Sequence, residues 1–220
     1  MSNPELISDD YRSLNARLHE TSEEYGNRNN FLARELPTSI AILRKLFSYT
    51  SVLDYGCGKG LILESLNKKL KPLGMDIQGY DPCVEKFSGP PKPADILLCT
   101  DVLEHVEPEK TEEVLRHIRS LTLNVSYLII DLLPAAKLLP DGRNAHINLN
   151  TAGWWLNALS DSFPFSLQYL LEKREDQISQ KIPVKKLVFV GAKSNSSILA
   201  AMNLFSATHA QAETKKVSIK

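Results

Sequence analysis

The chain has 220 residues, of which 43% are apolar and 24% are charged, as in an ordinary globular protein. Its 26 basic and 26 acidic residues cancel, so no overall positive charge exists to attract nucleic acid or an anionic membrane. No segment approaches 18 uninterrupted apolar residues, and the polar start lacks the profile of a signal peptide. The three cysteines, Cys57, Cys83 and Cys99, have no metal-ligand spacing, which favours reduced thiols in a cytoplasmic protein.

The first 50 residues have the apolar spacing of two helices. Leu14 and Leu18 share a face in the first helix. The second is expected from about residue 31 to residue 47, with Pro37 as a candidate break. We interpret residues 1–50 as an N-terminal helical cap or lid.

A turn-rich loop, from Tyr25 to Asn30, joins these two helices. Loops beside active sites often carry binding residues, so this region is a candidate to bring His19, Tyr25 or Arg28 to a cofactor or substrate. Simple packing is the alternative for each of them. We take Tyr25 as the substrate-binding candidate.

The stretch from Ser51 to Gly60 places a glycine-rich loop between a strand and a helix. Val52 and Leu53 have the character of a buried strand end, and residues 61–70 have the apolar spacing of a helix. Glycines in such a loop let the backbone approach a ligand closely. The glycines are Gly56, Gly58 and Gly60, and Asp54 lies two residues before the first.

This pattern is G-x-G-x-G, whereas the dinucleotide fingerprint G-x-G-x-x-G has its third glycine one residue later. With Asp54 ahead of it, the pattern resembles the first motif of class I S-adenosylmethionine (SAM) methyltransferases. In that family the acidic residue lies near the cationic methionine end of the cofactor, and the glycines pass beneath its amino-acid portion. The resemblance therefore implies cofactor contacts from Asp54, Gly56, Cys57, Gly58 and Gly60.

A second strand runs from Ile77 to Asp81, and Asp81 falls 21 residues after Gly60. A carboxylate at the carboxyl end of that strand can accept hydrogen bonds from both hydroxyls of a ribose. We therefore predict that Asp81, with Pro82 after it, contacts the cofactor.

The lengths of the segments after residue 82 and after residue 164 indicate how the two edges of the sheet are built. Residues 83–93 are short and proline-rich and leave little room for the helix and third strand usual in this family. We expect a trimmed edge there, with the loop near Phe87 closing over the adenine. At the other edge, residues 165–172 and 184–190 fit the last antiparallel pair of the sheet.

Residues 94–101 have the near-continuous apolar run of a central strand and lead into the phrase D-V-L-E-H-V, from Asp101 to Val106. This phrase resembles the post-strand motif of SAM-dependent small-molecule methyltransferases. In those relatives the first position borders the methyl donor, so the resemblance implies cofactor contacts from Asp101 and Val102. His105 is a candidate base, because a histidine titrates near neutrality; capping or packing is the alternative.

The long connection from Leu132 to Phe165 is the predicted substrate wall. Asp131, at the end of the preceding strand, is a candidate to face the same cleft. His146 lies just before a short helix that begins near Thr151, and it is the second candidate base, although it could instead only pin its own loop. On that helix adjacent tryptophans point about 100° apart. We expect one in the core and take Trp154 as a substrate contact.

Together these motifs imply an α/β fold: a class I methyltransferase (Rossmann-like) three-layer sandwich. Its sheet is expected to be mostly parallel and seven-stranded, with one antiparallel strand. The expected divisions are the cap at 1–50, a SAM-binding domain at 51–193 and a flexible tail at 194–220 with at most one weak helix. The expected activity is methyl transfer from S-adenosyl-L-methionine to a small-molecule acceptor, such as a sugar, a nucleotide or a natural-product-like metabolite, with no metal.

Three other functions stay open at this stage. A nucleic-acid methyltransferase is disfavoured by the neutral charge, by the absence of a D-P-P-aromatic motif at Asp101, and by Cys99 lacking a preceding proline. A non-catalytic SAM-binding module is compatible with the same motifs. Divalent-metal assistance would need Asp101 and Asp131 to converge with a histidine.

Overall fold

The structure is a computed structural model that describes residues 5–23, 25–26, 30–173 and 184–206. Arg28, most of the loop between the last two strands, and the end of the predicted tail lie outside the described residues.

Six strands form one sheet in the described part of the chain, in the order β2-β1-β3-β4-β6-β5. The strands β1 to β4 are parallel to their neighbours within that group, and β6 runs antiparallel to both β4 and β5. The reversed strand is thus present as expected. The strands are β1 (Ser51–Tyr55), β2 (Asp76–Tyr80), β3 (Ala94–Thr100), β4 (Thr122–Asp131), β5 (Phe165–Lys173) and β6 (Val184–Ala192).

The expected count of seven strands is wrong by one, and the shortfall lies at the β2 edge. Between β2 and β3 the chain forms only a short 3-10 turn, Glu85–Phe87. A crossover to another parallel strand needs a dozen or more residues, so the chain here is too short to build one. The trimmed edge was predicted for this reason.

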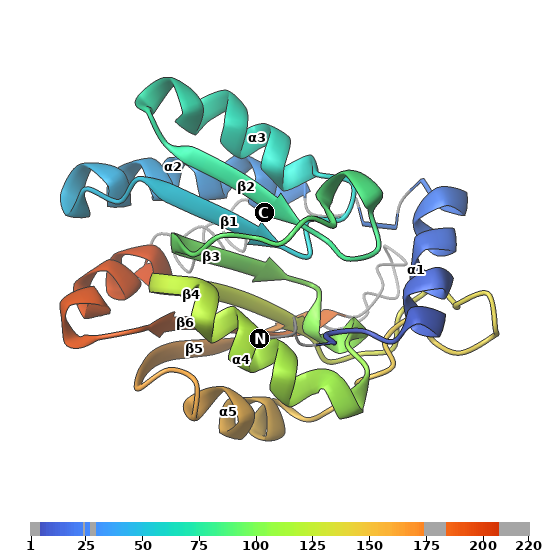
Figure 1. Ribbon diagram of the computed structural model, residues 1–220. Coiled ribbons are helices and arrows are strands. Elements are labelled where there is room, and N and C mark those ends of the chain that lie inside the picture. The colour runs from blue at the N-terminus through green and yellow to red at the C-terminus, as the bar shows by residue number, and fades with distance from the viewer. Residues whose placement is uncertain (1–4, 24, 27–29, 174–183, 207–220) are drawn as a thin grey trace, which may run out of the picture.

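In the described part of the chain, helices complete a three-layer arrangement, with α2 and α3 on one face of the sheet and α4 and α5 on the other (Figure 1). The central strand β3 serves both layers: Ile96 and Leu98 join the α2–α3 core, whereas Leu97 and Cys99 join the α4–α5 core. No helix in the described ranges is both long and apolar enough to cross a membrane. The helices are α1 (Asp9–Thr21), α2 (Asn30–Phe47), α3 (Leu61–Leu70), α4 (Thr111–Leu121) and α5 (Ala152–Ser160).

The predicted N-terminal cap divides into two parts with different roles. Helix α2 buries Leu36, Ile40 and Leu43 completely against the sheet, so it belongs to the main core and not to a lid. Pro37 does not break it. A proline cannot bond the carbonyl four residues earlier, and here the Ser65 hydroxyl of α3 donates to that carbonyl, Ala33 O, instead.

The predicted tail also differs from expectation in its first part. Residues 198–206 are helical, which agrees with the weak helix expected there. Ala200 and Leu204, four residues apart on one face, are fully buried in the same core as α2. The packed unit therefore extends past residue 193 to at least residue 204.

The carboxyl ends of β1, β3 and β4 point to one edge of the sheet, and α1 lies across that edge (Figure 1). Ser8 caps α1 and anchors it, because its amide and hydroxyl donate to the two carboxylate oxygens of Glu107 at 2.8 and 2.7 Å. Within the described residues of the predicted cap, α1 and the segments next to it cover the edge where open α/β sheets bind ligands, whereas α2 does not.

Candidate functional site

A cavity of about 430 Å³ lies at this edge, within the size range of small-molecule sites. The glycine loop and the end of β2 line one end of it. The segment after β3, the start of the 132–150 connection and His146 line the other, and α1 closes it from outside. Most of the predicted site residues meet here: Tyr25, Asp54, Gly56, Cys57, Gly58, Asp81, Pro82, Asp101, Val102, His105, Asp131 and His146.

At two positions of the loop, both the backbone conformation and the surrounding atoms require a glycine. Gly56 has φ +74°, and a Cβ there would come within 2.4 Å of a Val102 methyl group. Gly58 has φ +52°, and its Cβ would come within 2.7 Å of the Gly26 carbonyl oxygen. A side chain at either position would therefore meet strain and a collision. Gly60 is not in the cavity lining; it forms the N-cap of α3, so its predicted cofactor contact is not direct.

Asp54 is a buried carboxyl group with a strongly raised pKa at this end. Its side chain is 2% exposed, and Oδ2 has no hydrogen-bond partner among the described residues. Burial, and secondarily the nearby charge of Asp81, raise the pKa of Asp54 to about 7. A buried carboxylate without a partner is costly, so this end of the cavity favours a cationic ligand group.

Asp81 ties the end of β2 to the loops around it. Its Oδ2 accepts from the Gly58 amide at 2.9 Å, and its Oδ1 accepts from the Cys83 amide at 2.9 Å. Each carboxylate oxygen has a second lone pair, so both remain able to accept a ligand hydroxyl. Asp81 therefore has a structural role in the loop as well as the predicted binding role.

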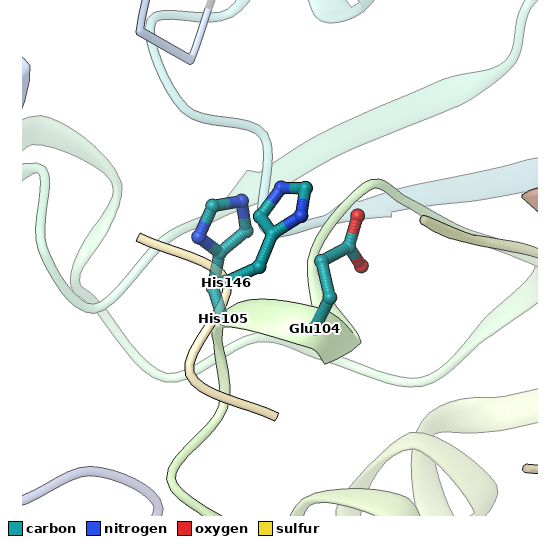
Figure 2. Close-up of side chains that lie close together, drawn as sticks. All are labelled: Glu104, His105 and His146. Carbon is teal, nitrogen blue, oxygen red and sulfur yellow. The ribbon is translucent and has the colours of Figure 1, made fainter. Parts of the chain in front are cut away.

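The other end of the cavity gathers Glu104, His105 and His146 (Figure 2). The two imidazole rings are 4.7 Å apart between centroids and nearly perpendicular. His105 Nδ1 lies 2.8 Å from Ala145 O, and His146 Nδ1 lies 2.5 Å from Leu133 O. A carbonyl oxygen only accepts, so both Nδ1 atoms carry a proton, and the lone pair of such a ring in its neutral form lies on Nε2.

Glu104 is fully buried, and only one of its carboxylate oxygens is bonded. Oε1 accepts from the Asp131 amide at 3.0 Å, whereas Oε2 has no partner in the described part of the chain. Burial and then the Asp101 charge raise the pKa of Glu104 well above its usual value. For His105, burial and then the neighbouring His146 lower the pKa to about 3, so the ring is neutral.

Lys186 lies between the carboxylates of Asp101 and Asp131, the two acidic residues considered as joint ligands of a metal. Its ammonium lies 2.6 Å from Asp101 Oδ1 and 3.5 Å from Asp131 Oδ2. Burial disfavours the ammonium, but the two carboxylates outweigh it and raise the pKa of Lys186. The alternative in which Asp101 and Asp131 join a histidine around a metal therefore needs correction, because both face this lysine.

Tyr25 links the N-terminal segment to the histidines. Its hydroxyl donates to Asn15 Oδ1 at 2.8 Å and lies 3.3 Å from His105 Nδ1. Burial raises the pKa of Tyr25, so the hydroxyl keeps its proton. The contact supports a role for this predicted residue in fixing the position of His105.

Trp154 does not reach the cavity. It lies on α5 with 42% of its surface exposed, whereas Trp155 is fully buried in the α4–α5 core. The prediction that one tryptophan is in the core is confirmed, whereas Trp154 lies outside the cavity lining, so its predicted substrate contact has no support there. Helix α5 covers a face of the sheet and not its carboxyl edge.

Several residues of the site were missed by sequence reasoning. Glu104 stands in the D-V-L-E-H-V phrase, but the resemblance implies no contact for it. Lys186 is a charged residue in a predicted strand, which is a weak signal in itself. Asn144 has no distinctive signal in the long connection, yet its Oδ1 accepts from the amides of Ala135 and His146, both at 2.9 Å, and so it shapes the loop that carries the imidazole.

A family model described as a methyltransferase domain matches residues 16–166, which is more than half of the chain. A comparison with curated protein sequences gives no significant match.

Three solved structures share the fold. The 1,6-didemethyltoxoflavin N1-methyltransferase of Burkholderia thailandensis, solved with 1,6-didemethyltoxoflavin and S-adenosylhomocysteine, is 15% identical over 89% of this chain and 92% of that chain, with a TM-score of 0.51. The N-methyltransferase NodS of Bradyrhizobium japonicum, in complex with S-adenosylhomocysteine, is 11% identical over 84% and 100%, with a TM-score of 0.51. The plantazolicin methyltransferase BpumL, in complex with a pentazolic desmethylPZN analogue and S-adenosylhomocysteine, is 17% identical over 84% of this chain and 96% of that chain, with a TM-score of 0.51.

Proposed function

The chain belongs to the methyltransferase domain family, and from that premise we propose that it transfers the methyl group of S-adenosylmethionine to a small polar acceptor. A sugar, a nucleotide or a natural-product-like metabolite fits this description. The observation that carries the proposal is one cavity with two chemically different ends: the glycine loop with the unpaired Asp54 carboxylate, and the histidine pair.

The first end suits the methyl donor. S-adenosylmethionine carries a sulfonium and an ammonium, and Asp54 is a buried carboxylate that has no cation to pair with among the described residues. Its ribose offers two hydroxyls, and Asp81 has free lone pairs on both oxygens. Gly56 and Gly58 leave room for the ligand to approach the backbone. Cys57 and Pro82 complete this donor end, and Asp101 and Val102 border it on the acceptor side.

The second end suits the acceptor. The sulfonium supplies the leaving group, so the protein must mainly align the acceptor with the methyl group and receive its proton. His105 and His146 are held by backbone carbonyls through Nδ1, which leaves Nε2 of each ring to accept a hydrogen bond from an acceptor O–H or N–H. For His146, pinning its own loop and contacting the acceptor are therefore compatible roles of the two ring nitrogens.

The proposal limits the size of the acceptor. Helix α1 lies over the cavity, and its residues Tyr11, Asn15 and His19 line it. Lys59 fastens the following segment to the glycine loop, since its amide donates to Gly26 O at 3.1 Å and its ammonium to Ser22 O at 2.7 Å. An acceptor must fit beneath this cover, which favours a small molecule over a folded polymer.

Calorimetry with three ligands tests the donor assignment. We expect S-adenosylmethionine and S-adenosylhomocysteine to bind and NADH to bind poorly, because the loop is G-x-G-x-G and Asp54 favours a cation. Tight NADH binding without a signal from S-adenosylmethionine would overturn the proposal. Release of S-adenosylhomocysteine over a panel of small hydroxyl and amine acceptors then tests catalysis. Donor binding with no turnover on any of them would favour a non-catalytic module.

A further inference from the structure

We propose that Glu104, His105 and His146 bind a divalent transition-metal cation at the acceptor end of the cavity. One ligand atom from each residue, a carboxylate oxygen or an imidazole nitrogen, lies within 4.8 Å of the others (Figure 2). Two imidazoles with one carboxylate form a donor set that suits Zn²⁺, Fe²⁺ or Co²⁺ better than Mg²⁺ or Ca²⁺, which prefer oxygen ligands.

The three ligand atoms lie farther apart than in a site that holds a metal ion, but the difference is small. Bonds of about 2.0–2.1 Å in a tetrahedral site hold the ligand atoms roughly 3.3 Å apart. The three atoms would thus approach one another by up to about 1.5 Å when a cation enters. Rotation of the side chains provides such a movement without a change in the fold, because His105 and His146 border an open cavity.

The unbonded oxygen of Glu104 is an independent sign of a cation. The side chain is fully buried, its Oε2 has no hydrogen-bond partner in the described ranges, and its Oε1 is fixed by the Asp131 amide at 3.0 Å. A buried carboxylate oxygen without a partner is costly, and a cation supplies the missing partner. The ammonium of Lys186 does not do so, because it pairs with Asp101 and Asp131.

The histidines are held as metal ligands usually are. A ligating imidazole generally donates its other ring N–H to a carboxylate or a backbone carbonyl, which fixes the ring and its tautomer. Ala145 O and Leu133 O do this for His105 and His146, at 2.8 and 2.5 Å.

Three protein ligands leave at least one coordination position open toward the cavity. In a step that rests on the proposed function, an acceptor hydroxyl would occupy that position, and the cation would lower the pKa of the hydroxyl. The Nε2 atoms of His105 and His146 then bind the cation, which replaces their direct hydrogen bonds to the acceptor. The proton leaves to solvent, the oxygen forms a bond to the methyl carbon, and the carbon–sulfur bond breaks with its electron pair remaining on sulfur. This assigns an oxygen acceptor to the enzyme.

Metal titration of the full chain tests the site. The chelator-treated protein is titrated with Zn²⁺, Co²⁺ or Mg²⁺ by calorimetry, and the Co²⁺ complex is also followed by its visible absorption. We expect one equivalent of Zn²⁺ or Co²⁺ and much weaker Mg²⁺ binding. Glu104→Gln and His146→Ala should each weaken binding by more than about 100-fold, beyond the 10–100-fold typical of residues that only support a ligand.

The matched control is His117→Ala, since His117 lies on α4 and does not line the cavity. It should bind metal as the wild type does. Absence of binding, Mg²⁺ binding as tight as Zn²⁺ binding, or equal affinity in wild type and Glu104→Gln would each overturn the proposal. Glu104→Gln nearly keeps the shape of the side chain, so it decides the question if His146→Ala does not fold.

Binding of S-adenosylmethionine, measured on the same samples, separates this proposal from the proposed function. The chelator-treated protein should bind the donor with unchanged affinity, because the donor end holds none of the three ligands. Donor binding without metal binding would overturn the metal site alone. Metal binding without donor binding would overturn the proposed function and leave the site standing.

Discussion

The two ends of the cavity are built in different ways. At the donor end, one short run of sequence supplies most of the surface, and backbone atoms do much of the work: two glycines with positive φ and an amide that donates to Asp81. At the acceptor end, side chains from separate segments meet, and backbone carbonyls only fix their directions. A methyl donor that does not change can be bound by a fixed backbone. At the acceptor end, by contrast, the side chains can change when the acceptor is a different molecule.

The largest expected effect separates the two ends through His146. His146→Ala should reduce turnover by about 10²–10⁴-fold, the usual range for a group that handles the acceptor proton, and should leave the affinity for S-adenosylmethionine nearly unchanged. Steady-state kinetics and donor calorimetry measure the two quantities, with His117→Ala as the control. Loss of donor binding together with turnover would mean that the loop around His146 is structural. Full turnover would move the role to His105 or to no base.

The reverse pattern is expected for Asp81. Hydrogen bonds to a charged group contribute roughly 1.5–3 kcal/mol each, so Asp81→Ala should weaken donor binding by at least about tenfold. Asp81→Asn keeps one carbonyl acceptor for the Gly58 or Cys83 amide and should lie between wild type and Asp81→Ala. Thermal unfolding confirms that each variant is folded. Unchanged donor affinity in a folded Asp81→Ala would reduce this residue to a turn former.

A pH-dependent effect should belong to Asp54. Its pKa is raised to about 7 by burial and by Asp81, so its charge is present above pH 7 and lost as the pH falls. Donor affinity that depends on this charge should rise by about tenfold between pH 6 and pH 8, and Asp54→Asn should remove that rise. Cys57, Asp81 and Cys99 are other buried titratable groups that interact with Asp54. An identical pH profile in Asp54→Asn would assign the titration elsewhere.

The same raised pKa makes a prediction for the unliganded protein. The folded state holds the Asp54 proton up to about pH 7, while the unfolded chain releases it near the ordinary aspartate pKa of 3.8. The stability contributed by this proton is therefore complete below pH 3.8 and is lost as the pH rises to about 7. Asp54→Asn should flatten this part of the dependence of unfolding free energy on pH, which denaturant titrations at several pH values measure.

The smallest effect on donor affinity and turnover is expected for a substitution that lies outside both ends of the cavity. Trp154 is 42% exposed on α5 and does not line the cavity, so Trp154→Ala should change donor affinity and turnover by less than about twofold. Assays of both quantities check this. A large loss of turnover with intact donor binding would show that the acceptor reaches α5.

The sequence by itself determined the features that depend only on neighbouring residues or on the length of a connecting segment. The G-x-G-x-G loop after Asp54 needs only a strand, a turn and a helix in succession, and these form where predicted. The short stretch between β2 and β3 is too brief for another crossover, which is a property of length alone. The methyltransferase prediction rested on these local features, and the family match agrees with it.

Only the tertiary structure decided which distant side chains meet. Asp131 and Lys186 are opposite each other because β4 pairs with β6 in antiparallel register, and no local pattern specifies that register. Glu104 and His146 approach because a loop folded around Asn144 returns to the end of β3. The side of the sheet that α5 covers likewise placed Trp154 outside the cavity. Periodicity reports the face that a residue occupies on its own element, whereas a site depends on how the elements are ordered in space.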